Sequence, residues 1–178
     1  MARILLLFAH PALEKSRVHK QLLRHIPQQE NIRLHDLYEL YPDFLIDIEK
    51  EQQLLLQYDC IVLQHPFYWY GVPAILKQWM DLVLEHGWAY GAGGQALRGK
   101  TLFNAISCGA SSSAYSSEGR HGRTLDEFLV PFHQTARLCH MEYGDPFVVF
   151  GTHNLQETEI REEAIKFRNW LLTLSQTV

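Results

Sequence analysis

The sequence predicts an α/β protein in which a parallel five-stranded sheet lies between two layers of helices. Short, uninterrupted apolar runs such as residues 4–9 are typical of strands that are buried on both faces. These runs alternate along the chain with segments whose apolar residues recur at helical spacing, and strands that alternate with helices pair in parallel. The 178 residues suit one domain that spans 1–178.

The first part of the chain supplies three strands. Residues 4–9 form the first, and after a loop a helix follows in which Val18, Leu22 and Ile26 recur at helical spacing. Ser16 is placed to cap the start of that helix. Residues 31–35 predict a second, shorter strand. A polar helix at 48–57 then leads to a third apolar strand at 60–64.

The rest of the chain supplies two more strands and three helices. Pro73 suits the first position of a helix whose apolar stripe runs through residues 72–84. Residues 102–107 form the fourth strand, 125–140 a helix, 147–150 the fifth strand, and a long helix follows. Because crossovers between parallel strands are right-handed, these units predict the flavodoxin-like order 2-1-3-4-5. In that order a ligand lies outside the carboxyl ends of strands 1, 3 and 4.

Composition excludes several classes of protein. The formal net charge of −4 gives no support for a nucleic-acid groove or an anionic membrane surface as partner. Three widely spaced cysteines without a CxxC pair argue against a disulfide framework and against a metal site, and they fit a reducing cytoplasm. No apolar stretch approaches the roughly 18 residues that a membrane-spanning helix needs. We therefore expect a cytoplasmic protein.

The segment after the third strand is rich in aromatic residues. Residues 67–70 read Phe-Tyr-Trp-Tyr and lie between Pro66 and Pro73, where a turn is normally small and polar. Four rings cannot all point inward from a turn, and aromatic faces with backbone amides between them suit a planar conjugated ligand. The alternative is that Phe67 and Trp69 only cap the sheet.

The loop after the first strand predicts an anion site. His10, Lys15, Ser16, Arg17 and His19 lie just before or within the first turn of a helix. The exposed amides and the positive dipole end of a helix attract anions, to which these side chains add donors. The alternative is a capped helix start with solvated charges. Neither a GxGxxG motif nor a P-loop is present.

The loop after the fourth strand carries small residues and two polar rings. Small side chains at 107–114 let a backbone approach a ligand closely. Tyr115 and His121 follow as a phenol and an imidazole that can donate hydrogen bonds or protons. The alternative is that both are structural. Cys108 is interpreted as a packing residue because no helper base is evident near it in the sequence.

Five motifs in order along the chain carry a resemblance to one family: Ala9-His10-Pro11; Tyr41-Pro42-Asp43-Phe44 with Asp47-Ile48 and Glu51-Gln52; Gln64-His65-Pro66 through Trp69 to Leu76-Lys77; His86-Gly87-Trp88-Ala89-Tyr90-Gly91; and Ser113-Ala114-Tyr115-Ser116 to His121-Gly122. Over nearly its whole length the chain resembles the flavodoxin-like NAD(P)H:quinone oxidoreductase family. It is most similar to the ancillary quinone reductases of bacterial glutathione-gated potassium efflux (Kef) systems.

The resemblance implies a bound flavin. The implied cofactor-binding residues fall in three groups: His10, Ser16, Arg17 and His19 near the phosphate; Pro66, Phe67, Tyr68, Trp69 and Tyr70 beside the isoalloxazine; and Ser107, Cys108, Gly109 and Ala110 along its other edge. FMN is favoured over FAD because the chain lacks the long C-terminal extension of the mammalian enzyme. Two departures from the family stand out: His19 replaces a frequent asparagine, and Ser107-Cys108-Gly109-Ala110 replaces Thr-Thr-Gly-Gly.

The resemblance also implies the reaction. NAD(P)H delivers a hydride to flavin N5, NAD(P)+ leaves, and a quinone takes the same place in a ping-pong cycle. Tyr115 and His121 fall on the family's tyrosine and histidine that assist hydride transfer and quinone protonation. The active sites would lie at the interface of a homodimer.

Two alternatives remain open. The chain could serve mainly as the regulatory subunit of a membrane potassium efflux channel, which would place it at the inner membrane. It could also be a one-electron carrier like flavodoxin, although a carrier needs no Tyr115/His121 pair.

Overall fold

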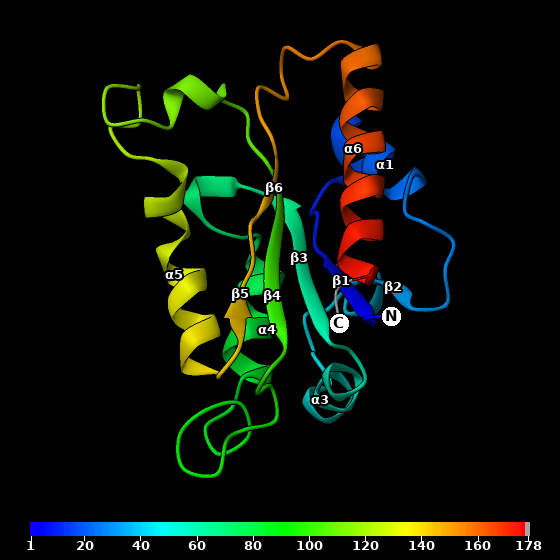
Figure 1. Cartoon of the computed structure of the whole chain (residues 1–178), viewed down its shortest axis with the longest axis vertical. Helices are drawn as coiled ribbons and strands as arrows, with labels where there is room; N and C mark the ends of the chain where they lie inside the picture. Colours follow the sequence, from blue (N-terminus) through cyan, green and yellow to red (C-terminus); the bar gives the residue numbers. More distant parts are fainter. Residues whose placement is uncertain (177–178) are drawn as a thin grey trace.

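A parallel sheet lies at the centre of the molecule between two helical layers (Figure 1). The computed structural model describes residues 1–176. The strands of the sheet follow the order β2-β1-β3-β4-β5, and β6 also pairs with β4. Their bounds are β1 (Ile4–Phe8), β2 (Ile32–Asp36), β3 (Cys60–Pro66), β4 (Thr101–Ser107), β5 (Glu142–Tyr143) and β6 (Phe147–Val149). Every pairing is parallel, so the predicted fold class and strand order are confirmed.

The fifth position of the sheet holds two short strands instead of the single predicted one. β5 pairs with the start of β4, whereas β6 pairs with its end, from Ala105 to Ser107. Between them lie Gly144 and Pro146. A side chain at Gly144 would clash with the ring of Phe103, and Pro146 has no backbone N–H to give to a ladder. Gly144 N still donates to Leu102 O (2.9 Å), and pairing with β4 resumes at Phe147, so β5 is a two-residue strand that the predicted strand at 147–150 does not include.

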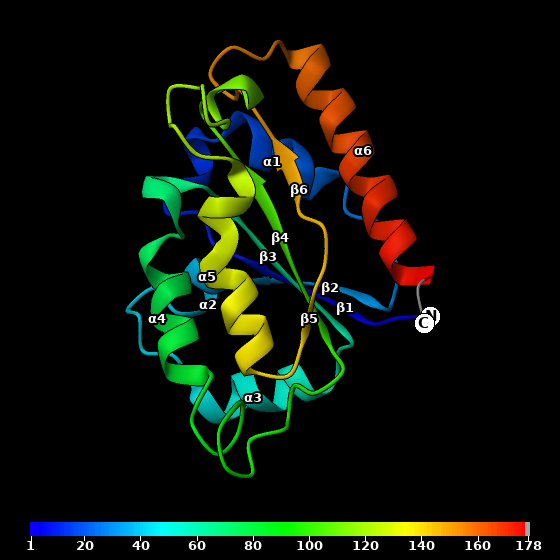
Figure 2. The same cartoon turned by 60° about the vertical axis from the view of Figure 1, so that its left-hand side comes forward.

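The helices cover both faces of the sheet. They are α1 (Arg17–Arg24), α2 (Leu37–Leu40), α3 (Ile48–Leu56), α4 (Ala74–Val83), α5 (Leu125–Leu138) and α6 (Glu157–Gln176). α1 and α6 lie on one face, and α3, α4 and α5 lie on the other (Figure 2). Ser16 caps α1 as predicted, since its side chain accepts a hydrogen bond from His19 N. Pro73 was predicted to be the first helical residue of α4, but it is the N-cap, so the helix begins one residue later, at Ala74.

Side chains of β1 alternate between two hydrophobic cores. Leu5 and Leu7 pack with the α3, α4 and α5 layer, whereas Ile4 and Leu6 pack with α1 and α6. All five residues of β1 are fully buried, as expected for a central parallel strand. Among residues 1–176, no helix combines the length and the apolarity needed to cross a membrane.

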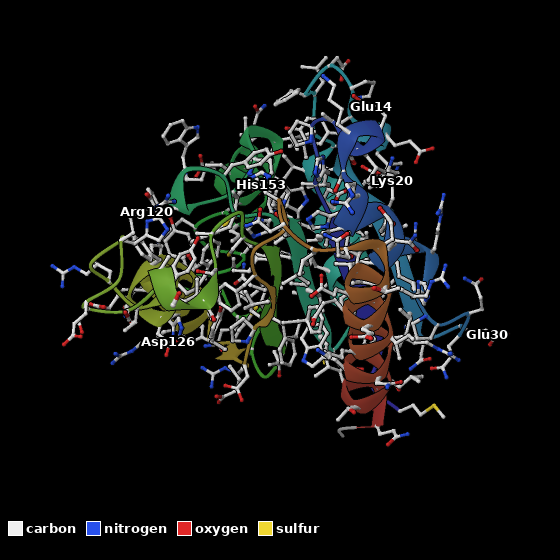
Figure 3. The ribbon with its side chains drawn as sticks, turned by 90° about the horizontal axis from the view of Figure 1, so that it is seen from above. Glu14, Lys20, Glu30, Arg120, Asp126 and His153 are labelled. Atoms are coloured by element: carbon white, nitrogen blue, oxygen red, sulfur yellow. The ribbon has the colours of Figure 1, made fainter. Side chains whose placement is uncertain are left out.

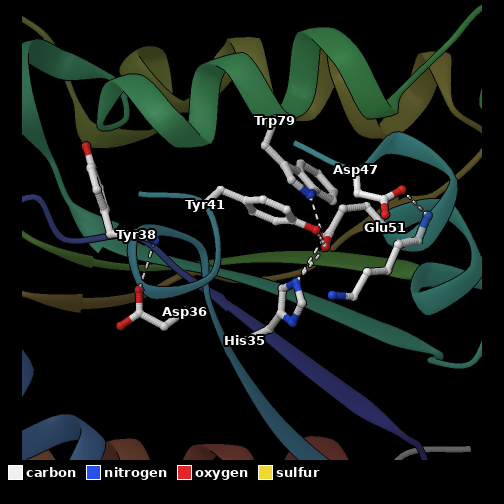
Figure 4. Close-up of polar contacts among 8 residues, drawn as sticks. His35, Asp36, Tyr38, Tyr41, Asp47, Glu51 and Trp79 are labelled. Atoms are coloured by element: carbon white, nitrogen blue, oxygen red, sulfur yellow. Dashed lines mark hydrogen bonds and ion pairs between the residues drawn. The ribbon is translucent and has the colours of Figure 1, made fainter. Parts of the chain in front are cut away.

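A buried carboxylate connects the layer of α3, α4 and α5 to the sheet. Glu51 of α3 accepts hydrogen bonds from His35 Nε2 of β2 (2.9 Å), from the Tyr41 hydroxyl (2.6 Å) and from Trp79 Nε1 of α4 (2.8 Å) (Figure 4). Burial alone would raise the pKa of Glu51, but these donors outweigh burial and lower it. The group is therefore an ionised carboxylate with three donors, and it joins four segments of the chain.

Replacing this carboxylate by an amide should destabilise the protein. In Glu51→Gln the side-chain NH2 faces N–H and O–H donors, so we expect the free energy of unfolding to fall by about 3 kcal/mol. Urea denaturation measures this change. Glu49→Gln is the matched control, because Glu49 lies exposed on the same helix and should lose only a few tenths of a kcal/mol. Equal stability of the two variants would contradict a structural role for the Glu51 cluster.

Candidate functional site

The carboxyl ends of β1, β3 and β4 meet at one edge of the sheet, and a cleft of about 550 Å³ opens there. Four segments line it: His10, Ala12, Lys15, Ser16, Arg17 and Val18; Pro66, Phe67, Tyr68 and Trp69; Ser107 and Gly109; and Thr152 and His153. The position is the one expected for a ligand of this fold.

One corner of the cleft is basic. The N-terminal turn of α1 faces it together with Lys15 and Arg17. The guanidinium of Arg17 donates to Glu157 Oε1 through Nε (3.0 Å) and Nη2 (2.9 Å), which joins the starts of α1 and α6. Of the described residues that line the cleft, none is an aspartate or a glutamate. This corner is suited to an anion.

Two histidines lie beneath this corner. His19 is fully buried, its Nε2 lies 2.9 Å from Ser107 Oγ, and its ring packs against that of His10 with centroids 5.1 Å apart. Burial lowers the pKa of His10 and holds that of His19 well below its usual value. His19 Nδ1 has no hydrogen-bond partner among the described residues. A buried nitrogen without a partner is costly, so a water or a bound group is expected to satisfy it. His19 itself does not line the cleft.

The aromatic turn is held in an unusual backbone conformation. Trp69 (φ 51°) and Tyr70 (φ 61°) are both left-handed, which is uncommon for bulky residues and marks local strain. Phe67 and Tyr68 line the cleft, and the Trp69 side chain at its edge is 95% exposed. The ring of Tyr70 stacks on Phe128 of α5 (4.8 Å) outside the cleft lining. Three of the four rings therefore border the cleft.

Tyr115 and His121 lie together behind the aromatic wall. Their ring centroids are 4.6 Å apart, and Tyr115 packs against Phe67 (6.4 Å). His121 Nδ1 lies 3.3 Å from the Tyr70 hydroxyl, whereas Nε2 is buried without a partner in residues 1–176. Burial, aided by Cys108, raises the pKa of Tyr115, so its hydroxyl stays protonated. The two predicted catalytic residues are thus brought together, but neither lines the cleft.

The remaining predicted residues divide between cleft and core. Cys108 is 1% exposed, and burial raises the pKa of its thiol to about 11, which fits its interpretation as a packing residue. Ala110 borders a neighbouring cavity instead of the cleft. Thr152 and His153, which follow β6, also line the cleft but were not among the predicted site residues. The sequence does contain a signal for them, because the predicted fifth strand ends at the same edge of the sheet.

A chain of buried hydrogen bonds fixes the start of the aromatic turn. The Pro66 carbonyl can only accept, so His65 Nδ1–H donates to it (3.0 Å). His65 Nε2 then accepts from Asn104 Nδ2 (3.1 Å), and Asn104 Oδ1 accepts from the Tyr143 hydroxyl (2.8 Å). His65 and Asn104 are both fully buried. This series of hydrogen bonds thus connects side chains of β5, β4 and β3 to the Pro66 carbonyl in the cleft wall.

Sequence comparison identifies relatives over nearly the full length of the chain. A family model described as "Flavodoxin-like fold" matches residues 2–171. An NAD(P)H oxidoreductase of Bacillus subtilis, YrkL, is 45% identical over 169 residues, which cover 95% of this chain and 97% of the relative. The glutathione-regulated potassium-efflux system ancillary protein KefG of Pectobacterium atrosepticum is 43% identical over 169 residues, covering 95% of this chain and 92% of KefG.

Solved structures show the same arrangement. General stress protein 14 of Treponema denticola, crystallised in complex with FMN, is 38% identical with a TM-score of 0.91, covering 97% of this chain and 99% of that one. An NADPH-quinone reductase from P. pentosaceus is 30% identical with a TM-score of 0.86 and covers 99% of both chains.

His65 should make folding sensitive to acid. Burial lowers its pKa from 6.5 to about 4, so the folded protein holds it neutral while the unfolded chain takes up a proton. Its contribution is complete above pH 6.5 and is lost as the pH falls toward 4, at about 1.4 kcal/mol per pH unit. Urea denaturation between pH 7 and pH 4.5 should show a shallower pH dependence in His65→Gln than in the parent. His140→Asn, at an exposed histidine, is the control and should keep the parent slope.

Proposed function

The chain belongs to the family of proteins with a flavodoxin-like fold, and we propose that it is an FMN-dependent NAD(P)H:quinone oxidoreductase. The cleft at the ends of β1, β3 and β4 carries this proposal, because it combines a basic corner at a helix N-terminus with an aromatic wall. The names of the NAD(P)H oxidoreductase and the NADPH-quinone reductase support the activity, and the FMN complex supports the cofactor.

The basic corner fits the phosphate of FMN. Ser16 and the free amides at the start of α1 would donate to phosphate oxygens, and Lys15 and Arg17 would supply charge. The observation that favours an anion at this corner is that Lys15, Ser16 and Arg17 line it while no aspartate or glutamate does among the described residues. Arg17 also forms an exposed ion pair with Glu157 at the start of α6, which would compete with a phosphate for its guanidinium.

The opposite wall fits a flat ring system. Pro66, Phe67 and Tyr68 would lie along one side of the isoalloxazine, and the backbone of Ser107 and Gly109 would lie along the other. Gly109 leaves room for His153, because a Cβ there would lie 2.7 Å from His153 Nε2. Tyr70, Cys108 and Ala110, also proposed from the resemblance, would support this site from behind or beside it.

When bound, FMN supplies the two-electron chemistry that accepts a hydride from a nicotinamide and returns it to a quinone. The chain must bind and orient both substrates over the cleft and protonate the quinone oxygens. Tyr115 keeps its proton because its pKa is raised, so its hydroxyl can donate to a developing oxyanion. His121 has a free ring nitrogen for the same task, and Tyr70 orients its other nitrogen.

The proposal predicts a yellow protein that oxidises NAD(P)H with menadione as acceptor. Tyr115→Phe and His121→Gln should lower kcat by about 10²-fold while FMN content stays unchanged, since each removes a proton donor but no contact in the cleft lining. Absorbance spectra give the FMN content, and steady-state kinetics give kcat and KM separately.

Tyr58→Phe is the matched control, because Tyr58 lies in the core of the same face, away from this cleft, and should leave kcat unchanged. Protein that binds neither FMN nor FAD would refute the proposal. Full kcat in both variants would instead remove Tyr115 and His121 from the mechanism while leaving the activity intact.

We also propose that the protein is a homodimer whose partner covers the mouth of the cleft. The strained turn presents the nearly fully exposed Trp69 between Tyr68 (45% exposed) and Tyr70 (47% exposed). Adjacent exposed aromatic side chains are typical anchors of protein interfaces. A partner over this turn would complete the cleft and exclude water from it.

The dimer proposal predicts a mass of twice one chain by light scattering. Trp69→Asn removes the ring and suits a left-handed backbone, so it should weaken the dimer at least about tenfold without unfolding the chain. Leu138→Gln replaces an exposed apolar residue at the end of α5 and should leave the dimer intact. A monomeric parent would rule out the dimer.

The similarity to KefG favours a second candidate, a regulatory subunit of a potassium efflux channel with secondary oxidoreductase activity. Both candidates require a bound flavin, so flavin content does not separate them. Co-purification with a channel encoded in the same genome would favour the regulatory subunit, and its absence would favour a free-standing enzyme.

A further inference from the structure

A second cavity of about 660 Å³ adjoins the cleft. It lies between the loop after β4 and the loop before α6, and it shares Gly109 and His153 with the cleft. Its other lining residues are Ala110, Ser111, Ser113, Ala114, Gly119, Arg120 and Asn154. Figure 3 looks down on this end of the molecule, with Arg120 and His153 labelled on different loops.

The two loops hold these side chains through their backbones. His121 N donates to Ala114 O (3.1 Å), and a side chain at Gly119 would clash with the Ser113 carbonyl, so the backbone beside Arg120 is closely packed. Gly151 N donates to Ala110 O (2.9 Å), which fixes the second loop just before His153. These contacts fix the backbone of both loops around the cavity.

The wall is basic and carries no carboxylate. Arg120 has neither an ion pair nor a side-chain hydrogen bond within residues 1–176. Ser111 and Ser113 place their hydroxyls 2.9 Å apart, and His153 adds an imidazole. None of the described residues that line either cavity is acidic, although the whole chain carries a net charge of −4.

An arginine without a neighbouring carboxylate is the feature by which a protein discriminates NADPH from NADH. In dinucleotide-binding Rossmann folds a site for NADH places a carboxylate on the 2′-hydroxyl of the adenosine ribose, and the same electrostatic argument holds for any site, since a carboxylate there repels the extra phosphate of NADPH. A site for NADPH places an arginine there, because a guanidinium binds phosphate through two hydrogen bonds. The second cavity has the arginine and lacks the carboxylate.

We propose that this cavity binds the 2′-phosphate of NADPH, with Arg120 as the specificity-determining residue, so that the enzyme prefers NADPH to NADH. The inference rests on the proposed function, which puts the nicotinamide in the cleft. The adenosine end must then extend outside the cleft, and the second cavity adjoins the cleft on the other side of Gly109 and His153, which line both. His153 and the hydroxyls of Ser111 and Ser113 complete the phosphate contacts.

Steady-state kinetics on the FMN-loaded protein, with menadione as acceptor, test the preference. We expect kcat/KM to be at least about tenfold higher for NADPH than for NADH, the difference expected from one charge-assisted contact. Arg120→Ala should lower kcat/KM for NADPH about tenfold more than for NADH, mainly through KM, and Arg120→Lys should restore part of the loss.

Arg123→Ala is the matched control. Arg123 lies three residues further on, pairs with Glu127 (3.0 Å) and does not line the cavity, so the NADPH/NADH ratio should not change. Equal kcat/KM values for NADPH and NADH in the parent enzyme would overturn the inference. An equal fall in kcat/KM for both nucleotides in Arg120→Ala would also overturn it.

A binding measurement keeps this test independent of turnover. Calorimetric titration with adenosine 2′,5′-bisphosphate and with adenosine 5′-monophosphate should show tighter binding of the bisphosphate in the parent and in Arg123→Ala, but not in Arg120→Ala. Equal affinities would overturn the inference even if the enzyme is active. Purification with FAD would also overturn it, because the adenosine half of FAD would then occupy this cavity. Inactive protein that still shows the Arg120-dependent difference would count against the proposed function alone.

Discussion

The parallel pairing of β1, β3 and β4 is the constraint on which the site depends. The register pairs Pro66 with Ser107, so β3 and β4 end level, and it pairs Phe8 with Gln64, so β1 ends two residues earlier at the same edge. Parallel strands buried on both faces can satisfy their backbone groups only through this ladder. The loops after them therefore meet at one edge, and three of the four segments that line the cleft follow from that register alone.

Two buried polar clusters then hold the second layer and the aromatic turn in place. Glu51 accepts hydrogen bonds from β2, from Tyr41 just after α2 and from α4, and the His65–Asn104–Tyr143 series of hydrogen bonds ends on the Pro66 carbonyl. Each group in these clusters has its partner, so they select one arrangement of the packed layers: an alternative packing would leave buried donors and acceptors unpaired. The left-handed turn at Trp69 costs free energy, and this surrounding order is what allows it to persist.

Local patterns predicted most of the fold, and tertiary contacts decided the rest. Apolar runs located the three central strands β1, β3 and β4, and Ser16 indicated the start of α1 because capping is a local interaction. The short strand β5 could not be predicted locally, because Glu142 and Tyr143 form no apolar run and pair with Thr101 and Leu102 far away in the sequence. In the site, the loops could be predicted from strand order, but the stacking of Tyr70 on Phe128 and the position of His153 over Gly109 required the packed chain. The hydrogen bond between His65 and Asn104 could not be predicted either, because the two residues are far apart in the sequence and meet only in the packed chain.

The burial of the cysteines has a chemical consequence for a protein that handles quinones. Quinones are electrophiles that add to thiolates, and the thiolate is the reactive form of cysteine. Cys60, Cys108 and Cys139 are all buried, and burial raises the pKa of each thiol. Cys108 lies between two cleft residues, Ser107 and Gly109, yet it keeps its proton and stays covered. The protein can thus hold an arylating compound in its cleft without exposing a cysteine thiolate to it.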